Sequence, residues 1–219
     1  MNVEQARFNM IEQQIRPWEV LDQGVLTLLS IVKREDFVPP AYRSLAFVDM
    51  EIPLPAGQHM LAPKVEARLL QELAVGRHET VLEVGAGSGY MAALLAHRAR
   101  ELTTMEIVPD LATMARTNLQ RAAAAVRNVR VVEGDGAKGL PGDGPFDAIL
   151  LSGSVSTAPR QLLLQLAVGG RMVAIVGNEP IMRAVRITRT AEQSFHTVEL
   201  FDTVAQRLVG FDEGPRFQF

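Results

Sequence analysis

The sequence contains no cysteine. This absence excludes disulfide bonds, cysteine-ligated zinc and a cysteine nucleophile together. The four histidines, His59, His78, His97 and His196, are scattered and show none of the short spacings at which histidines bind a metal ion. We therefore expect no metal site.

The sequence also lacks positive charge in excess and long apolar runs. Its formal net charge is −3 and its pI is about 5.8, so no basic field favours nucleic acid as a partner. No apolar run approaches the length of a membrane-spanning helix. The first turns carry Glu4, Arg7 and Glu12, where a signal peptide would have an apolar segment. We expect a soluble cytoplasmic protein with no membrane or nucleic-acid partner.

The length and hydrophobic content indicate one domain. The chain has 219 residues, of which 47% are hydrophobic, and these can bury one full core. We expect residues 1–219 to form a single domain, with residues 1–75 as a helical and loop layer and residues 76–219 as a sheet core. The oligomeric state is left open.

One stretch, Thr80 to Tyr90, organises the rest of the chain. A short apolar run leads into Gly85-Ala86-Gly87-Ser88-Gly89, and a helical pattern follows at once. A strand, a glycine turn and a helix form the opening unit of a nucleotide-binding α/β sheet. Glycine lets a ligand approach the main chain, and the start of a helix offers N–H groups to it. These five residues are therefore a predicted cofactor site.

The glycine spacing separates two classes of cofactor. A dinucleotide fold carries G-x-G-x-x-G, whereas here Gly89 comes one residue early and Tyr90 follows it. Glu83 lies inside the apolar strand, where an unpaired carboxylate would be costly, so we expect it near the strand end, facing a polar ligand. The pattern E-x-G-x-G-x-G resembles the first motif of Rossmann-like methyltransferases that use S-adenosylmethionine. A glycine turn without a ligand is the alternative.

Alternating strand and helix patterns follow the glycine motif. The link Gly177–Pro180 is too short for a parallel crossover, so the next strand should run antiparallel to the one before it. The sequence predicts an α/β fold with a seven-stranded, mostly parallel sheet, helices on both faces and antiparallel strands at the C-terminal end. After Thr80–Val84, strands are expected at Leu102–Ile107, Val129–Val132, Phe146–Leu151, Met172–Val176, Met182–Thr188 and His196–Leu200, with helices at Pro109–Ala124 and Pro159–Leu166.

The N-terminal part predicts helices and irregular chain. A helix is expected from Val3 to Ile15 with Phe8, Ile11 and Ile15 on one face. The stretch from Tyr42 to Pro63 has too many prolines for a long helix and should wrap the sheet. Two further helices are expected, at Asp22–Val32 and from Val65 to Leu73.

Two acidic positions follow strands of the predicted sheet. Glu106 and Ile107 end the second strand roughly 20 residues after the glycines, where such folds place an acid on the ribose hydroxyls. Asp135 and Gly136 follow the third strand, and Asp135 can be offered to an adenine amino group. For Glu106 the alternative is an exposed glutamate at a strand end, and for Asp135 it is an ordinary turn. We expect all four residues to belong to the cofactor site.

Short motifs over most of the chain resemble those of protein-L-isoaspartate (D-aspartate) O-methyltransferases. The glycine motif is shared by many methyltransferases, but the N-terminal pieces are more specific. The matching pieces are Met10–Arg16, Arg34–Pro39, Leu54-Pro55 with Gly57-Gln58 and Pro63, Val81–Tyr90, Gly134-Asp135-Gly136, Gly144–Asp147, and Gln165-Leu166 with Gly169-Gly170-Arg171.

This resemblance implies methyl transfer from S-adenosylmethionine to the carboxylate of an isoaspartyl residue in a damaged protein or peptide. A carboxylate with a pKa near 4 is already ionised at neutral pH, so the acceptor needs no base. The site has to align carboxylate, methyl group and sulfur and exclude water, and orientation of this kind can be worth roughly 7–11 kcal/mol. We therefore expect no histidine base.

The loop from Gln58 to Leu61 departs from the family pattern. The family usually has G-Q-T-I-S there, and its hydroxyl groups are thought to serve the active site. Here the loop is Gly57-Gln58-His59-Met60-Leu61, without a hydroxyl group, and Ser152-Gly153-Ser154 replaces a threonine-alanine run. Gln58, His59, Leu61 and Ser152 are the candidate acceptor-site residues. A packing or surface role is the alternative for His59.

Two other functions stay open. The same fold could methylate a different acceptor, such as a small molecule, or it could bind S-adenosylmethionine without catalysis. A dinucleotide oxidoreductase is disfavoured by the glycine spacing. Ser152-Gly153-Ser154-Val155 does not supply the acid-Pro-Pro-aromatic loop of an enzyme that methylates nucleic-acid amino groups.

The loop predicts normal cofactor affinity with weak or absent activity on standard isoaspartyl peptides. Each buried polar acceptor left without its donor costs about 1–3 kcal/mol, so two losses lower turnover by roughly two to four decades. The variant His59→Thr/Leu61→Ser should regain part of this activity. A methyl ester assay at saturating S-adenosylmethionine checks it, and turnover typical of the family in the unaltered protein would show that the hydroxyls are dispensable.

Overall fold

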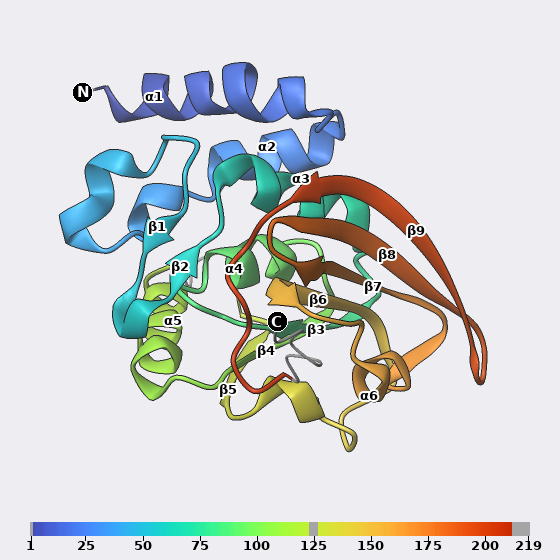
Figure 1. Ribbon diagram of the computed structural model, residues 1–219. Coiled ribbons are helices and arrows are strands. Elements are labelled where there is room, and N and C mark those ends of the chain that lie inside the picture. Colours follow the sequence, from blue (N-terminus) through green and yellow to red (C-terminus); the bar gives the residue numbers. More distant parts are fainter. Residues whose placement is uncertain (1, 123–126, 212–219) are drawn as a thin grey trace, which may run out of the picture.

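The computed structural model describes residues 2–122 and 127–211. A seven-stranded sheet forms its centre in the order β5-β4-β3-β6-β7-β8-β9, and a two-stranded sheet of β1 and β2 lies beside it (Figure 1). The strands of the large sheet are β3 (Thr80–Val84), β4 (Glu101–Glu106), β5 (Val129–Glu133), β6 (Phe146–Val155), β7 (Leu166–Asn178), β8 (Ile181–Ala191) and β9 (Ser194–Thr203).

The first five strands of this order are parallel, and β7-β8 and β8-β9 are antiparallel. The predicted fold class and the antiparallel β8 are confirmed. The turn between β7 and β8 leaves no room for a crossover helix, and Asn178 pairs directly with Ile181.

Both faces of the central strands are buried. Val81, Ala148 and Leu150 belong to one hydrophobic cluster, whereas Leu82 and Ile149 belong to a second. Successive side chains of a strand point to opposite faces, so this alternation places one cluster on each side of the sheet. Parallel strands with two covered faces are typical of α/β folds.

Helices cover these two faces. The helices α2, α3, α4 and α5 contribute to the first cluster, and α6 contributes Leu162 and Leu163 to the second. Their bounds are α2 (Gln23–Ile31), α3 (Pro63–Leu73), α4 (Tyr90–Ala96), α5 (Pro109–Arg121) and α6 (Arg160–Leu163). The predicted end of α5 at Ala124 lies outside the described residues.

The N-terminal layer begins with α1 (Val3–Met10), which continues as a π-helical turn η1 (Ile11–Ile15) and a 3-10 turn η2 (Arg16–Trp18). Phe8, which the sequence groups on one helix face with Ile11 and Ile15, is 58% exposed, whereas the two isoleucines are buried. Arg7 is buried and forms an ion pair with Glu35. The spacing of apolar residues does not reveal that this charged side chain has a buried partner.

Irregular chain connects α2 to α3, as the prolines predict. It contains the short strands β1 (Ile52–Pro53) and β2 (His59–Met60) and the 3-10 turns η3 (Arg34–Asp36), η4 (Pro40–Leu45) and η5 (Pro55–Gly57). Arg34 is buried and pairs with Glu66 of α3, and its guanidinium also donates to the carbonyl oxygens of Ala46 and Leu61. Arg34 therefore ties this irregular chain to α3.

Several strands are longer than the sequence predicts. The predicted end of a strand at Leu151 is wrong, because β6 continues to Val155. The predicted helix Pro159–Leu166 is likewise too long, since α6 ends at Leu163 and Leu166 already pairs with Phe146. Hydrogen bonds to neighbouring strands extend β6 and β7 beyond their predicted ends. The sequence of one strand does not show which neighbours it will pair with.

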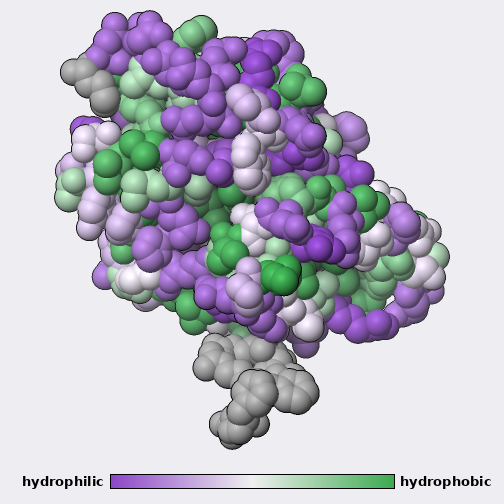
Figure 2. All heavy atoms as spheres, turned by 45° about the horizontal axis from the view of Figure 1, so that its top comes forward, coloured by the Kyte–Doolittle hydropathy of each residue, from purple (hydrophilic) through white to green (hydrophobic). Residues whose placement is uncertain are grey.

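Among the described residues, no helix has the length and apolar character needed to cross a membrane. Figure 2 shows one face of the molecule, on which hydrophobic residues reach the surface in small patches between hydrophilic ones. Small scattered patches of this kind are normal on a protein surface.

Candidate active site

A cleft lies at the carboxyl ends of the parallel strands. Ligands of open α/β sheets bind at this edge, because the loops that follow neighbouring strands meet there. The sequence predicted eight of the residues that line the cleft. These are Gln58, His59, Gly85, Gly87, Glu106, Ile107, Gly136 and Ser152.

Glu106 anchors the glycine loop to β4. One carboxylate oxygen accepts a hydrogen bond from Gly87 N–H at 2.8 Å, and the other accepts from Val108 N–H at 3.0 Å. The main-chain N–H groups of Gly85 and Ala86 also donate to β4, at the carbonyl oxygen of Met105. The carboxylate is therefore held at the floor of the cleft with its orientation fixed.

Glu83 lies one residue before the end of β3 and is fully buried. Its two carboxylate oxygens accept hydrogen bonds from the hydroxyl groups of Thr104 and Ser152, each at 2.7 Å. Burial raises the pKa of Glu83 to about 7, against the opposing effect of these two hydroxyl groups. The side chain thus faces hydroxyl groups of the protein and connects β3 with β4 and β6.

The loop Gly57–Leu61, here called the acceptor-site loop, forms a second wall. His59 and Ser152 line both the cleft and an adjoining small cavity, which Leu61, Ala86 and Ser88 also line. Glu66 and Tyr90 face this cavity, and the buried Tyr90 hydroxyl has no hydrogen-bond partner among the described residues. The candidate acceptor residues therefore lie together, next to the glycine loop.

Two further predicted cofactor residues also lie outside the cleft lining. Gly89 precedes α4 with a φ of +85°, and a Cβ there would lie 3.2 Å from Ala115 of α5. The backbone conformation and the close packing against α5 therefore explain why position 89 is a glycine. Asp135 accepts a hydrogen bond from Ala137 N–H at 3.0 Å and lines a neighbouring cavity together with Gly210.

The chain after β9 contributes residues that the sequence did not indicate. Leu208 and Val209 line the cleft, and the Ser154 and Leu208 N–H groups form hydrogen bonds that pair this segment with the end of β6. A Cβ at Gly85 or at Gly153 would lie 2.8 Å from a methyl group of Leu208. Residues 204–211, here called the C-terminal segment, therefore pack over the glycine loop.

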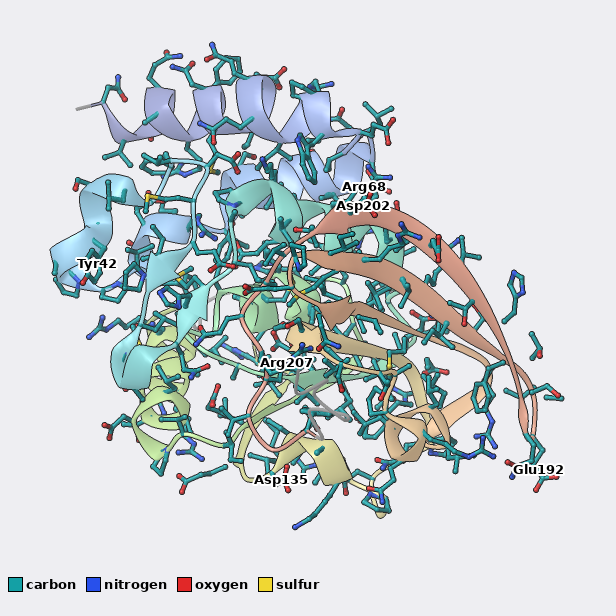
Figure 3. All side chains as sticks on the ribbon, viewed as in Figure 1. Tyr42, Arg68, Asp135, Glu192, Asp202 and Arg207 are labelled. Carbon is teal, nitrogen blue, oxygen red and sulfur yellow. The ribbon has the colours of Figure 1, made fainter. Side chains whose placement is uncertain are left out.

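Figure 1 shows the C-terminal segment in red, descending from β9 across the middle of the molecule. Arg207 lies on this segment near the centre of Figure 3, with Asp135 below it. In the sequence, Leu208 and Val209 look like part of an ordinary surface loop. Only the tertiary structure, in which both line the cleft and Leu208 lies over Gly85, could have identified them.

Comparison with known proteins decides the family. The family model described as protein-L-isoaspartate(D-aspartate) O-methyltransferase matches residues 5–206. This chain belongs to that family. A protein-L-isoaspartate O-methyltransferase 1 of Rhodopseudomonas palustris is 41% identical over 209 residues, which cover 95% of this chain and 84% of the relative. A protein-L-isoaspartate O-methyltransferase of Koribacter versatilis is 37% identical over 204 residues, which cover 93% of this chain and 90% of the relative.

A solved structure extends the likeness to the fold. It is a crystal structure from Plasmodium falciparum of a protein named as an isoaspartyl methyltransferase, in complex with S-adenosyl-L-homocysteine. It superimposes with a TM-score of 0.79 at 20% identity and covers 96% of this chain and 99% of its own. The isoaspartyl methyltransferase family therefore accounts for the fold over nearly the whole chain.

The buried carboxyl group of Glu83 predicts a pH-dependent stability in this family member. Its pKa is raised from 4.5 to about 7 in the folded protein, so the stabilisation is complete below about pH 4.5 and is lost as the pH rises through about 7. The variant Glu83→Gln cannot ionise, so its free energy of unfolding relative to the unaltered protein should increase between about pH 4.5 and pH 7 and then level off. Urea denaturation at several pH values measures this. Glu101→Gln, at an exposed position, is the control. If the stability of Glu83→Gln changed with pH in parallel with that of the unaltered protein, the raised pKa of Glu83 would be contradicted.

Proposed function

We propose that this protein transfers a methyl group from S-adenosylmethionine to the carboxylate of isoaspartyl residues in peptides or proteins, and that it does so in the cytoplasm. The observation that carries the proposal is the position of His59 and Ser152, which lie between the glycine-loop cleft and the adjoining cavity. A donor in one and an acceptor in the other would meet at these two residues.

The cleft suits S-adenosylmethionine. Each oxygen of the Glu106 carboxylate accepts one main-chain hydrogen bond and can accept another, such as one from a ribose hydroxyl group. The apolar side chains of Leu54, Leu111 and Leu208 line the same space and exclude water. The glycine loop, Ile107 and Gly136 complete the site. Asp135 lines the neighbouring cavity, from which we propose that its carboxylate accepts a hydrogen bond from the adenine amino group.

When bound, S-adenosylmethionine supplies a methyl group on a positively charged sulfur, which an ionised carboxylate accepts without a proton transfer. The protein's task is therefore to orient the carboxylate and to keep water out. Arg34 supports this task, because its guanidinium donates a hydrogen bond to the carbonyl oxygen of Leu61 at 2.9 Å and forms an ion pair with Glu66. Arg34 thereby fixes the acceptor-site loop against α3.

A small-molecule acceptor is the second candidate. One feature of the acceptor-site loop favours a small molecule. Met60 and Leu61 are buried and offer no side-chain hydrogen-bonding group to a peptide. Both candidates require the same cofactor cleft, so the acceptor has to be tested directly.

The proposed acceptor predicts discrimination between two isomeric peptides. A peptide with one isoaspartyl residue should form a methyl ester, and the same sequence with a normal aspartyl residue should not, because the two differ in where the free carboxylate lies. The measurement is methyl transfer from labelled S-adenosylmethionine. Equal labelling of both peptides would contradict the isoaspartyl specificity. Labelling of neither peptide, while the cofactor binds, would favour the small-molecule acceptor.

The cofactor site predicts a loss of affinity in Glu106→Ala. A hydrogen bond to a charged group contributes about 1.5–3 kcal/mol, so binding should weaken roughly ten- to a hundredfold. Isothermal titration calorimetry with S-adenosylmethionine measures it, and circular dichroism checks the fold. Glu101→Ala, on the same strand but exposed, should bind normally. Unchanged affinity in Glu106→Ala would overturn this role for the carboxylate.

A further inference from the structure

His59 is held by a residue of the C-terminal segment. The imidazole Nδ1 lies 2.8 Å from the side-chain oxygen of Gln206, and the side-chain nitrogen of Gln206 donates to the carbonyl oxygen of Gly57 at 2.7 Å. The Gln206 carbonyl oxygen in turn accepts from Ser154 N–H at 2.8 Å. A chain of hydrogen bonds thus runs from the end of β6 through Gln206 to the acceptor-site loop.

These contacts determine which ring nitrogen of His59 carries hydrogen. A main-chain carbonyl oxygen only accepts, so the amide nitrogen of Gln206 must face Gly57 and its oxygen must face His59. An amide oxygen also only accepts, so Nδ1 of His59 must be the donor. The other nitrogen, Nε2, has no partner among the described residues. It accepts a hydrogen bond when the ring is neutral and donates one when the ring is protonated.

Glu51 is an ionisable group that interacts electrostatically with His59, and burial raises the pKa of Glu51 against this effect. Glu106 lines the same cleft as His59, and Glu66 and Tyr90 line the same adjoining cavity. Arg207, next to Gln206 in the chain, donates instead to Gly177 and Asn178. Gln206 is therefore the group that sets the direction of the imidazole, and Nε2 is the atom left for a ligand.

His59 occupies one of the two positions, with Leu61, at which the acceptor-site loop lacks a hydroxyl donor. A hydroxyl group donates to a carboxylate at any pH near neutrality, whereas Nε2 donates only from the imidazolium. We propose that the His59 imidazolium donates from Nε2 to the acceptor carboxylate, and that Gln206 is the residue that positions it. This inference rests on the proposed function. It makes acceptor binding dependent on pH, while the carboxylate itself stays ionised down to about pH 4.

The test is the pH profile of kcat/KM for an isoaspartyl peptide at saturating S-adenosylmethionine. For the unaltered protein, kcat/KM should rise up to roughly tenfold as the pH falls from about 7.5 to about 5.5, where histidine takes up a proton. His59→Asn should flatten the profile. His196→Asn, at an exposed histidine of β9, is the matched control and should keep it.

A variant of Gln206 separates positioning from support of the fold. Gln206→Glu places a carboxylate opposite Nδ1–H and stabilises the imidazolium, so the rise in kcat/KM should move to higher pH. A merely structural role would lower the rate and leave the midpoint in place, and that result would overturn the inference. Turnover that does not vary with pH in the unaltered protein would also overturn it. Absence of turnover at every pH, with the cofactor bound, would contradict the proposed function as well.

Discussion

The parallel pairing of β3 with β4 on one side and β6 on the other is the constraint on which the site depends. Parallel neighbours end at the same edge of the sheet, so Gly85 after β3, Glu106 at the end of β4 and Ser152 in β6 converge there. The alternating clusters on the two faces hold this pairing, because a slip of one residue would turn every buried side chain to the wrong face. The chemistry of the cleft thus follows from the packing of the strands.

Buried polar groups transmit this order to the loops. Glu83 joins three strands through two hydroxyl groups, and Glu106 joins the glycine loop to β4. In the N-terminal layer, Arg34 joins η3, the acceptor-site loop and α3. A buried ion pair is weak evidence for stability, since desolvation offsets its attraction. Its hydrogen bonds to carbonyl oxygens nevertheless fix the position of a loop that has little regular structure.

Much of the fold was predictable from the sequence, and the reason differs from element to element. The turn at Gly177–Pro180 is local, so its length alone determined the antiparallel β8. The end of β6 was not predictable, because Ser152-Gly153-Ser154 resembles a loop and becomes strand by pairing with residues on β7 and the C-terminal segment. The burial of Arg7 was not predictable either, because periodicity does not reveal a buried partner 28 residues away.

The sequence by itself determined the glycine turn, the strand that leads into it and the acid that ends β4, because each of these is a local pattern with a steric or electrostatic cause. Residues far apart in the chain acquired their roles only in the tertiary structure. Gln206 meets His59 across 147 positions, and Leu208 packs over Gly85. Neither contact leaves a trace in local composition. Each exists because the antiparallel strands β8 and β9 return the chain across the sheet, so that its end passes over the carboxyl edge where the site lies.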